Sequence, residues 1–118
     1  MARGRPDNSS TLLTTGHWPL TTMLIGILQL ELRIGDAFNL SDKRKIVRSL
    51  KDRWHHHHNV SVAEVDHLDH PQHALLGITM VGTDARQLES SLARLVEHVK
   101  RERRAELLDF QIEVVAGR

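Results

Sequence analysis

The stretch that decides the fold is NVSVAEVDHLDHPQHALLGITMV, from Asn59 to Val81. Two apolar runs, residues 60–66 and 74–81, flank a short segment of Asp, His and Pro residues at 67–72. Apolar runs of this length, bounded by turn-forming residues, are typical of β-strands. We therefore predict a β-hairpin that supplies the middle of a sheet, with the rest of the chain arranged to cover it.

Regular patterns continue on both sides of the hairpin. The runs from Leu24 to Ile34 and from Leu107 to Val115 alternate apolar and polar residues, as half-buried strands do, with Leu108 and Phe110 among the inward positions. Apolar residues three and four apart predict helices at about 40–55 and from Thr83 or Asp84 to about Arg103. Asn39 and Asp42 have the spacing of a helix-capping box.

The predicted order is strand, helix, strand, strand, helix, strand. This order is that of the ferredoxin-like fold of the α+β class, a four-stranded antiparallel sheet with both helices on one face. A chain of 118 residues fits one domain. We predict a single domain over residues 23–116, preceded by a disordered arm over residues 1–22, which are rich in Ser and Thr and have no period.

Composition restricts the chemistry of the protein. Without cysteine the chain can form neither a disulfide nor a zinc–thiolate site, and it has no thiol nucleophile. The longest apolar run, at residues 23–28, is far shorter than the roughly 20 residues that cross a bilayer, so we expect no membrane span. The net charge is only +1, and attraction to nucleic acid therefore requires a local basic patch.

Two segments carry a family resemblance: NLSDKRKIVRSLKDR at residues 39–53 and NVSVAEVDHLD at residues 59–69. They resemble the YlxP-like family of small bacterial proteins, a domain-of-unknown-function family, over about residues 23–115. The resemblance implies a ferredoxin-like protein of the bacterial cytoplasm with a ribosome-linked role, because members are often encoded beside translation and ribosome-maturation factors. It supplies no catalytic residue or cofactor. This chain departs from the family at residues 1–22, at His55–His58 and at Pro71.

The first predicted helix carries an excess of positive charge. Between residues 42 and 54 there are six basic and two acidic residues, a balance of 6 − 2 = +4. Several of the basic residues fall in the opening turns, where the helix dipole and the free N–H groups favour anions. We therefore predict a phosphate-binding or RNA-binding site at this helix. Its residues are Lys43, Arg44, Lys45, Arg48 and Lys51. The alternative is a solvated helix face.

Two neighbouring surfaces bear on this hypothesis. In the predicted topology the second helix ends beside the start of the first, which would add Lys100, Arg101, Arg103 and Arg104 to the same edge. On the open sheet face the outward positions are polar or acidic and include no aromatic residue. An RNA partner would therefore be read through its backbone or shape on the helical side rather than by base stacking on the sheet.

The histidines suggest a metal site, since imidazole is a common ligand. The run His55–His58 and the group His67, His70 and His73 lie at opposite ends of one strand, roughly 20 Å apart, so they cannot share an ion. Either group by itself could bind zinc, nickel or copper, with Asp69 assisting the second group, but neither has a defined ligand spacing. The alternative is that these histidines are ordinary solvent-exposed residues of loops and helix ends. We expect no metal or other cofactor.

We also weighed a catalytic role for Asp66, His67 and Asp69. No nucleophile accompanies them, and a solvated hairpin tip does not exclude water. The sequence therefore favours a non-enzymatic cytoplasmic protein that binds structured RNA or the ribosome through the first helix. The first alternative is a homodimer or protein-interaction module that pairs through the strand near residues 60–65. The second is a metal-binding protein or hydrolase that uses the tip at residues 66–73.

Overall fold

The computed structural model describes residues 23–117, and the predicted N-terminal arm at residues 1–22 lies outside this range. The six elements follow the predicted order. They are β1 (Leu24–Arg33), α1 (Leu40–His57), β2 (Ser61–Asp66), β3 (His73–Gly82), α2 (Ala85–Lys100) and β4 (Glu106–Ala116). No helix within the described residues is long and apolar enough to span a membrane.

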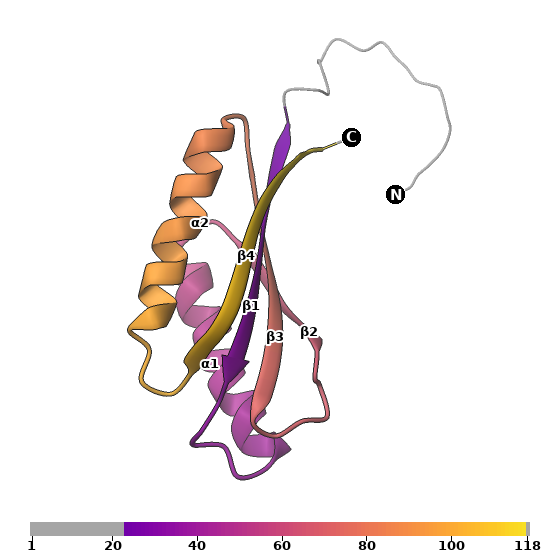
Figure 1. Ribbon diagram of the computed structural model, residues 1–118, viewed down its shortest axis with the longest axis vertical. Coiled ribbons are helices and arrows are strands. Elements are labelled where there is room, and N and C mark those ends of the chain that lie inside the picture. The colour runs from indigo at the N-terminus through magenta and orange to yellow at the C-terminus, as the bar shows by residue number, and fades with distance from the viewer. Residues whose placement is uncertain (1–22, 118) are drawn as a thin grey trace, which may run out of the picture.

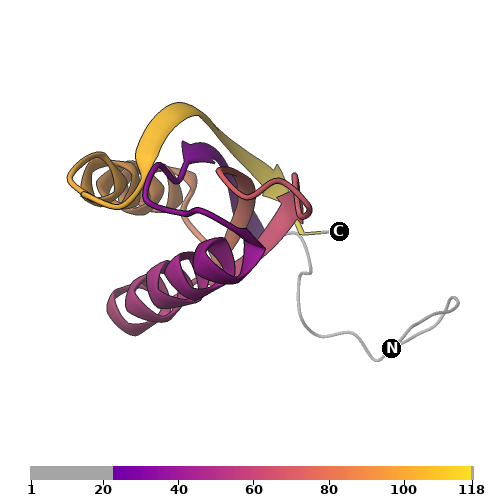
Figure 2. The same ribbon diagram turned by 90° about the horizontal axis from the view of Figure 1, so that it is seen from below.

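The four strands form one sheet in the order β2-β3-β1-β4, and each neighbouring pair is antiparallel. Both helices cover one face of this sheet, and the other face is open (Figures 1 and 2). The predicted ferredoxin-like fold is therefore confirmed. Of the two hairpin strands, β3 lies in the middle of the sheet as predicted, whereas β2 lies at its edge.

Local capping decides where the helices begin. The Asn39 side chain accepts a hydrogen bond from the Asp42 N–H at 2.9 Å, and Asp42 Oδ2 accepts one from the Phe38 N–H at 3.0 Å. The first bond satisfies an N–H group that the helix terminus leaves without a partner, and the second holds the residue that precedes the cap. Asp84 caps α2 in the same way, by accepting from the N–H groups of the first turn. The capping prediction at Asn39 is confirmed.

The core lies between the sheet and the two helices. The inward rows of β1 and β3 and the apolar stripes of both helices are buried, as predicted from their periods. The largest contributions come from Leu28, Leu30, Leu32, Leu50, Trp54, Leu76, Ile78, Leu92, Leu95 and Val99. Burial of a side chain of this size stabilises the fold by about 1.5–3 kcal/mol.

The sheet departs from simple alternation at the start of β4. Glu31 pairs with Asp109 and Leu32 pairs with Leu107, so Leu108 is the extra residue of a β-bulge. Leu108 is 43% exposed, and the prediction that it points inward is wrong. Leu107 packs against the core in its place.

Candidate nucleic-acid interface

Four of the five predicted phosphate-binding residues lie at the surface of α1. Arg44, Lys45 and Arg48 are exposed and Lys51 is half-buried. Positions 44, 48 and 51 are four and three residues apart and therefore share one face of the helix. We refer to these four residues as the α1 basic stripe. Ion pairs within residues 23–117 involve Lys43, Arg53, Lys100 and Arg104, and none of them includes a residue of the stripe.

Lys43, the fifth predicted residue, is completely buried. Its ammonium lies 2.7 Å from Glu64 Oε2, and the Glu64 side chain is itself only 14% exposed. It also donates to the carbonyl oxygens of His67 at 2.7 Å and His73 at 3.0 Å, with Leu68 O at 3.4 Å. All three ammonium protons therefore have acceptors inside the protein. The assignment of Lys43 to phosphate binding is wrong, because the residue holds the β2–β3 turn against α1.

The turn that Lys43 holds has an unusual backbone. His67 has φ of 60°, the only positive φ of a non-glycine residue within the described chain. Left-handed backbone costs a residue with a side chain roughly 1–2 kcal/mol. A hydrogen bond from a buried ammonium to the His67 carbonyl offsets this strain, since charge-assisted hydrogen bonds are the stronger ones. Lys43 thus fixes both the position of the turn and the side of α1 that faces the sheet.

The first turn of α1 was predicted to form an anion cradle. The structure instead fills it with the capping groups of Asn39 and Asp42. The Asp42 carboxylate takes the place beside the positive end of the helix dipole that a phosphate would occupy. Asn39 and Asp42 therefore make the first turn less favourable for an anion than the sequence suggested, and the basic stripe is left along the side of the helix.

The basic residues at the end of α2 do not extend the stripe. Arg104 Nη2 donates to Ser49 Oγ at 3.2 Å, and Arg53 pairs with Glu102. Ser49 and Arg53 are one turn apart, in the same row of α1 as Lys45, and they lie on a different face from Arg44, Arg48 and Lys51. The end of α2 therefore lies beside the middle and second half of α1, and the prediction that it lies beside the start of α1 is wrong.

Glu102 neutralises much of the charge at this junction. Burial by itself would raise the pKa of the Glu102 carboxyl, but hydrogen bonds from the Arg104 backbone and from the Arg53 and Arg104 side chains outweigh it and lower the pKa. The carboxylate is therefore ionised at neutral pH and holds two guanidinium groups. Arg53 and Arg104 are engaged in the fold, unlike the residues of the stripe.

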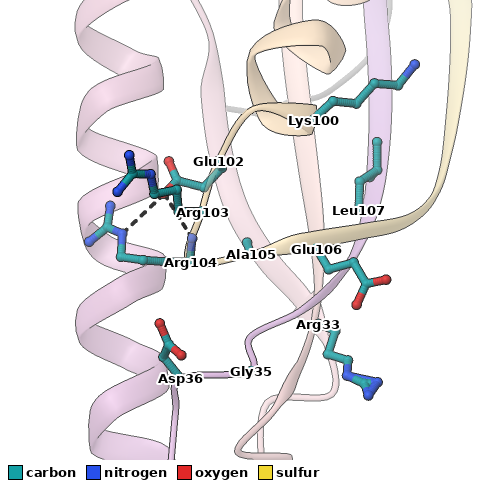
Figure 3. Close-up of a pocket in the computed structure, with 10 residues that line it drawn as sticks. All are labelled: Arg33, Gly35, Asp36, Lys100, Glu102, Arg103, Arg104, Ala105, Glu106 and Leu107. Carbon is teal, nitrogen blue, oxygen red and sulfur yellow. Dashed lines mark hydrogen bonds and ion pairs between the residues drawn. The ribbon is translucent and has the colours of Figure 1, made fainter.

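A cleft of about 470 Å³ lies between the loop after β1 and the segment that joins α2 to β4. Figure 3 shows that Arg103 and Arg104 extend on the α1 side of this cleft, whereas Arg33 and Glu106 extend on the other side. Four basic side chains and the carboxylates of Asp36, Glu102 and Glu106 line it together. Because the charges alternate and do not converge on one point, the cleft does not present a charged site of one sign.

The turn histidines lie together but do not form a ligand set. The ring centroids of His70 and His73 are 4.4 Å apart, and those of His67 and His73 are 6.1 Å apart. Desolvation, and then the charges of His73, His67 and Lys43, lower the pKa of His70. No three His, Cys, Asp or Glu residues within the described residues are arranged to hold a metal ion. The weak metal candidates His67, Asp69, His70 and His73 therefore gain no support.

A second histidine contact links the two helices. His58 Nε2 lies 3.3 Å from His98 Nδ1, a partner that the sequence analysis did not identify. Burial lowers the pKa of His58, and the positive charges of His98, His57 and Arg94 lower it further. The two residues are 40 positions apart in the sequence, so only the folding of the chain brings them into contact. Burial first, and then the neighbouring positive charges, therefore favour the neutral form of His58 at the junction of the helices.

One exposed aromatic residue was missed by the sequence analysis. Phe38 is 87% exposed and immediately precedes the cap of α1. An apolar residue at this position usually packs against the fourth residue of the helix. Here that residue is Lys43, which is buried elsewhere. The sequence could have revealed this exposure. Phe38 precedes the helix cap, and the helical residue that would normally pack against it is a lysine instead of an apolar residue.

The open sheet face is more apolar than predicted. Gln29, Glu31 and Asp109 lie on it as expected near β4. Near β2, however, Val65 and Val81 are 53% and 58% exposed. Gly77 leaves a hollow of about 410 Å³ beside Val65, lined also by Ile27, Ala63 and Thr79. Phe110 is 42% exposed at the β4 end of the sheet, but it pairs with the buried Leu30 and its ring centroid lies 5.9 Å from Lys100 Nζ at the end of α2. Its ring therefore belongs to the helical side, and among residues 23–117 the open face lacks the stacking platform of RNA-recognition domains.

Comparison with known proteins gives two matches. The family model described as "Protein of unknown function (DUF503)" matches residues 25–112, from β1 into β4. The "Uncharacterized protein YlxP" of Bacillus subtilis (strain 168) is 30% identical over 76 residues, which cover 64% of this chain and 83% of that protein. The family match includes all of α1, with Lys43 and the basic stripe.

The buried Lys43–Glu64 pair generates a first prediction. Replacing Lys43 by Met removes the ammonium and leaves Glu64 and three carbonyl groups without their partner, which should lower the free energy of unfolding by about 3–5 kcal/mol. Lys45→Met, at an exposed position of the same helix, should change it by less than about 0.5 kcal/mol. Urea denaturation at pH 7 measures both values.

The double variant Lys43→Met/Glu64→Met tests the same point. Because it removes both charges, it should regain the part of the lost stability that comes from the unpaired Glu64 carboxylate, whereas the part that comes from the carbonyl groups should remain. A Lys43→Met protein as stable as the wild type would contradict the role given to this pair.

His58 generates a prediction about pH. Its pKa is lower in the folded protein than the ordinary value of 6.5, so the unfolded chain binds more protons as the pH falls below about 7. The wild type should therefore lose stability between pH 7 and pH 5. His58→Gln should make this dependence shallower, and His98→Gln should also do so by removing a positive neighbour. Equal slopes of unfolding free energy against pH in wild type and His58→Gln would contradict the assignment.

Proposed function

The chain belongs to the DUF503 family of proteins of unknown function, and from this premise we propose that it is a non-enzymatic, cytoplasmic protein that binds structured RNA along the α1 basic stripe. The observation that carries the proposal is the contrast between two sets of basic residues. Arg53 and Arg104 are held by Glu102, whereas Arg44, Lys45, Arg48 and Lys51 have no carboxylate partner among residues 23–117.

The geometry of the stripe suits a phosphate backbone. Residues 44 to 51 extend over roughly 10 Å of the helix axis, at about 1.5 Å per residue. A duplex carries a phosphate about every 3.4 Å along each strand, so several phosphates lie within reach of these long side chains. Contacts of this kind position a nucleic acid without reading its sequence. The release of counterions makes such binding strongly dependent on salt.

The choice of the ribosome as the RNA partner is based on the resemblance to YlxP-like proteins. Because those proteins are often encoded beside translation and ribosome-maturation factors, the ribosome is the first partner to test. The lack of an aromatic platform on the open sheet face supports recognition of shape and backbone from the helical side.

The apolar hollow on the open sheet face favours a second candidate, a homodimer. Val65 is 53% exposed and lines this hollow with Ile27 and Ala63, so the apolar surface there is contiguous rather than a single exposed side chain. Pairing of the β2 edge is less favoured, because the register shift between Glu64 and Asp66 introduces a bulge, and bulged edge strands resist pairing. A second copy would therefore meet the open face rather than the edge.

The RNA proposal predicts a specific loss of salt dependence. In Arg44→Gln/Arg48→Gln/Lys51→Gln, binding to ribosomal subunits or to a structured RNA hairpin should weaken, and the slope of log K against log salt should fall by about 2–3. The matched control Arg86→Gln/Arg101→Gln/Arg103→Gln removes the same charge from exposed positions elsewhere. It should keep a slope near that of the wild type. Equal losses in both variants would show that only total charge matters.

The dimer candidate is tested by light scattering over a range of concentrations. A dimer through the open face should have twice the 13.5 kDa mass of the chain, and Val65→Asp should shift it toward the monomer by placing a charge in the contact. A wild type that stays monomeric at every concentration would remove this candidate.

A further inference from the structure

Phe38 is the most exposed large apolar residue within residues 23–117. It is 87% exposed, whereas the other exposed apolar residues of the described chain range from 41% to 58%. It lies one residue before the cap of α1, at the end of the helix where Arg44 and Lys45 begin the basic stripe. The molecule thus presents an aromatic ring and a row of cations from one short segment.

The fold keeps this ring in solvent. The usual partner of an apolar residue at this position is the fourth helical residue, which here is Lys43. Because the Lys43 side chain is used to hold the β2–β3 turn, it offers no apolar surface to Phe38. The exposure of the ring therefore follows from the same interaction that organises the turn.

The backbone beneath the ring is held on both sides. The Phe38 N–H donates to Asp42 Oδ2 at 3.0 Å. Ala37 is fully buried, and its carbonyl accepts a hydrogen bond from Gln72 Nε2 at 3.2 Å. A ring carried by a fixed backbone loses little conformational freedom when it binds, which makes it a preorganised contact.

The charges near Phe38 decide which part of a nucleic acid can bind there, a phosphate or a base. Asp36 is two residues before Phe38, and the Asp42 carboxylate accepts from the Phe38 N–H. These two negative charges disfavour a phosphate there, whereas the stripe beyond them favours phosphates. A nucleobase is uncharged and needs only one aromatic face to stack on. A base can therefore bind beside Phe38, where a phosphate is disfavoured.

We propose that Phe38 stacks on an unpaired base of the RNA whose backbone lies along the α1 basic stripe. The ligand class is then a structured RNA with a single-stranded loop or bulge beside its duplex, rather than a continuous duplex. This inference rests on the proposed function. A protein contact is less favoured, because Phe38 is flanked by buried Ala37 and polar Asn39 and is not the centre of a continuous apolar patch.

The test compares two RNAs and three variants. The RNAs are a hairpin with an unpaired loop and a fully paired duplex of the same length. Phe38→Ala should weaken binding of the hairpin by roughly 5- to 150-fold, the range found when one stacking aromatic is removed. Phe38→Trp should keep or increase the affinity, whereas Phe38→Leu should lose most of it. Because stacking releases no counterions, the salt slope should stay at the wild-type value.

Two controls make the result specific. Val81→Ala, an exposed apolar position on the sheet, should not change binding of either RNA. Duplex binding should be the same for wild type and Phe38→Ala. Since Phe38 is almost fully exposed, its variants should unfold at the wild-type urea midpoint, which excludes misfolding as the cause.

The contrary outcomes are distinct. Salt-dependent binding that is identical in wild type and Phe38→Ala would overturn this inference and leave the proposed function standing. Equal losses for hairpin and duplex would also overturn it, because the effect would not depend on an unpaired base. Unchanged RNA binding with loss of self-association would assign Phe38 to a protein contact. If the wild type bound neither RNA, the inference and the proposed function would both fail.

Discussion

The buried ammonium of Lys43 is the constraint on which the rest of this structure depends. It joins α1 to the β2–β3 turn through Glu64 and the carbonyl groups of His67 and His73. A lysine that enters the core fixes the rotation of its helix, because the neighbouring positions must then face outward. The exposure of Arg44, Lys45 and Arg48 follows from this rotation. So does the exposure of Phe38, which loses its usual helical partner.

Basic residues have three different roles in this small domain. Lys43 is buried and structural, since its protons are all bonded within the fold. Arg53 and Arg104 are joined to Glu102 where the two helices meet. The stripe on α1 has no such partners within the described residues. A net charge of +1 conceals this division, because Glu64, Glu97 and Glu102 pair with other basic residues while Glu31 and Asp109 lie on the open sheet face. Only the distribution of charge in space bears on binding.

Much of the fold could be predicted because it follows from local patterns. Alternation over β1 and β3, the helical spacing of the apolar residues and the capping residues Asn39 and Asp84 each act over a few positions. Several of the misses were non-local. Leu108 was placed inward because alternation alone does not reveal a bulge, which appears only when β4 pairs with β1. The contacts of Arg104 with Ser49 and of His58 with His98 join residues 55 and 40 positions apart.

The amino-acid sequence by itself determined the order of the elements, the two-layer ferredoxin-like arrangement and the presence of excess positive charge on the first helix. Tertiary structure decided which of those charges are available. Lys43 and Arg44 are adjacent in sequence and similar in chemistry, yet one is buried against a carboxylate and the other is exposed. The physical reason is that a charge can leave water only where enough acceptors converge on it. That convergence exists only after the β2–β3 turn has folded against α1.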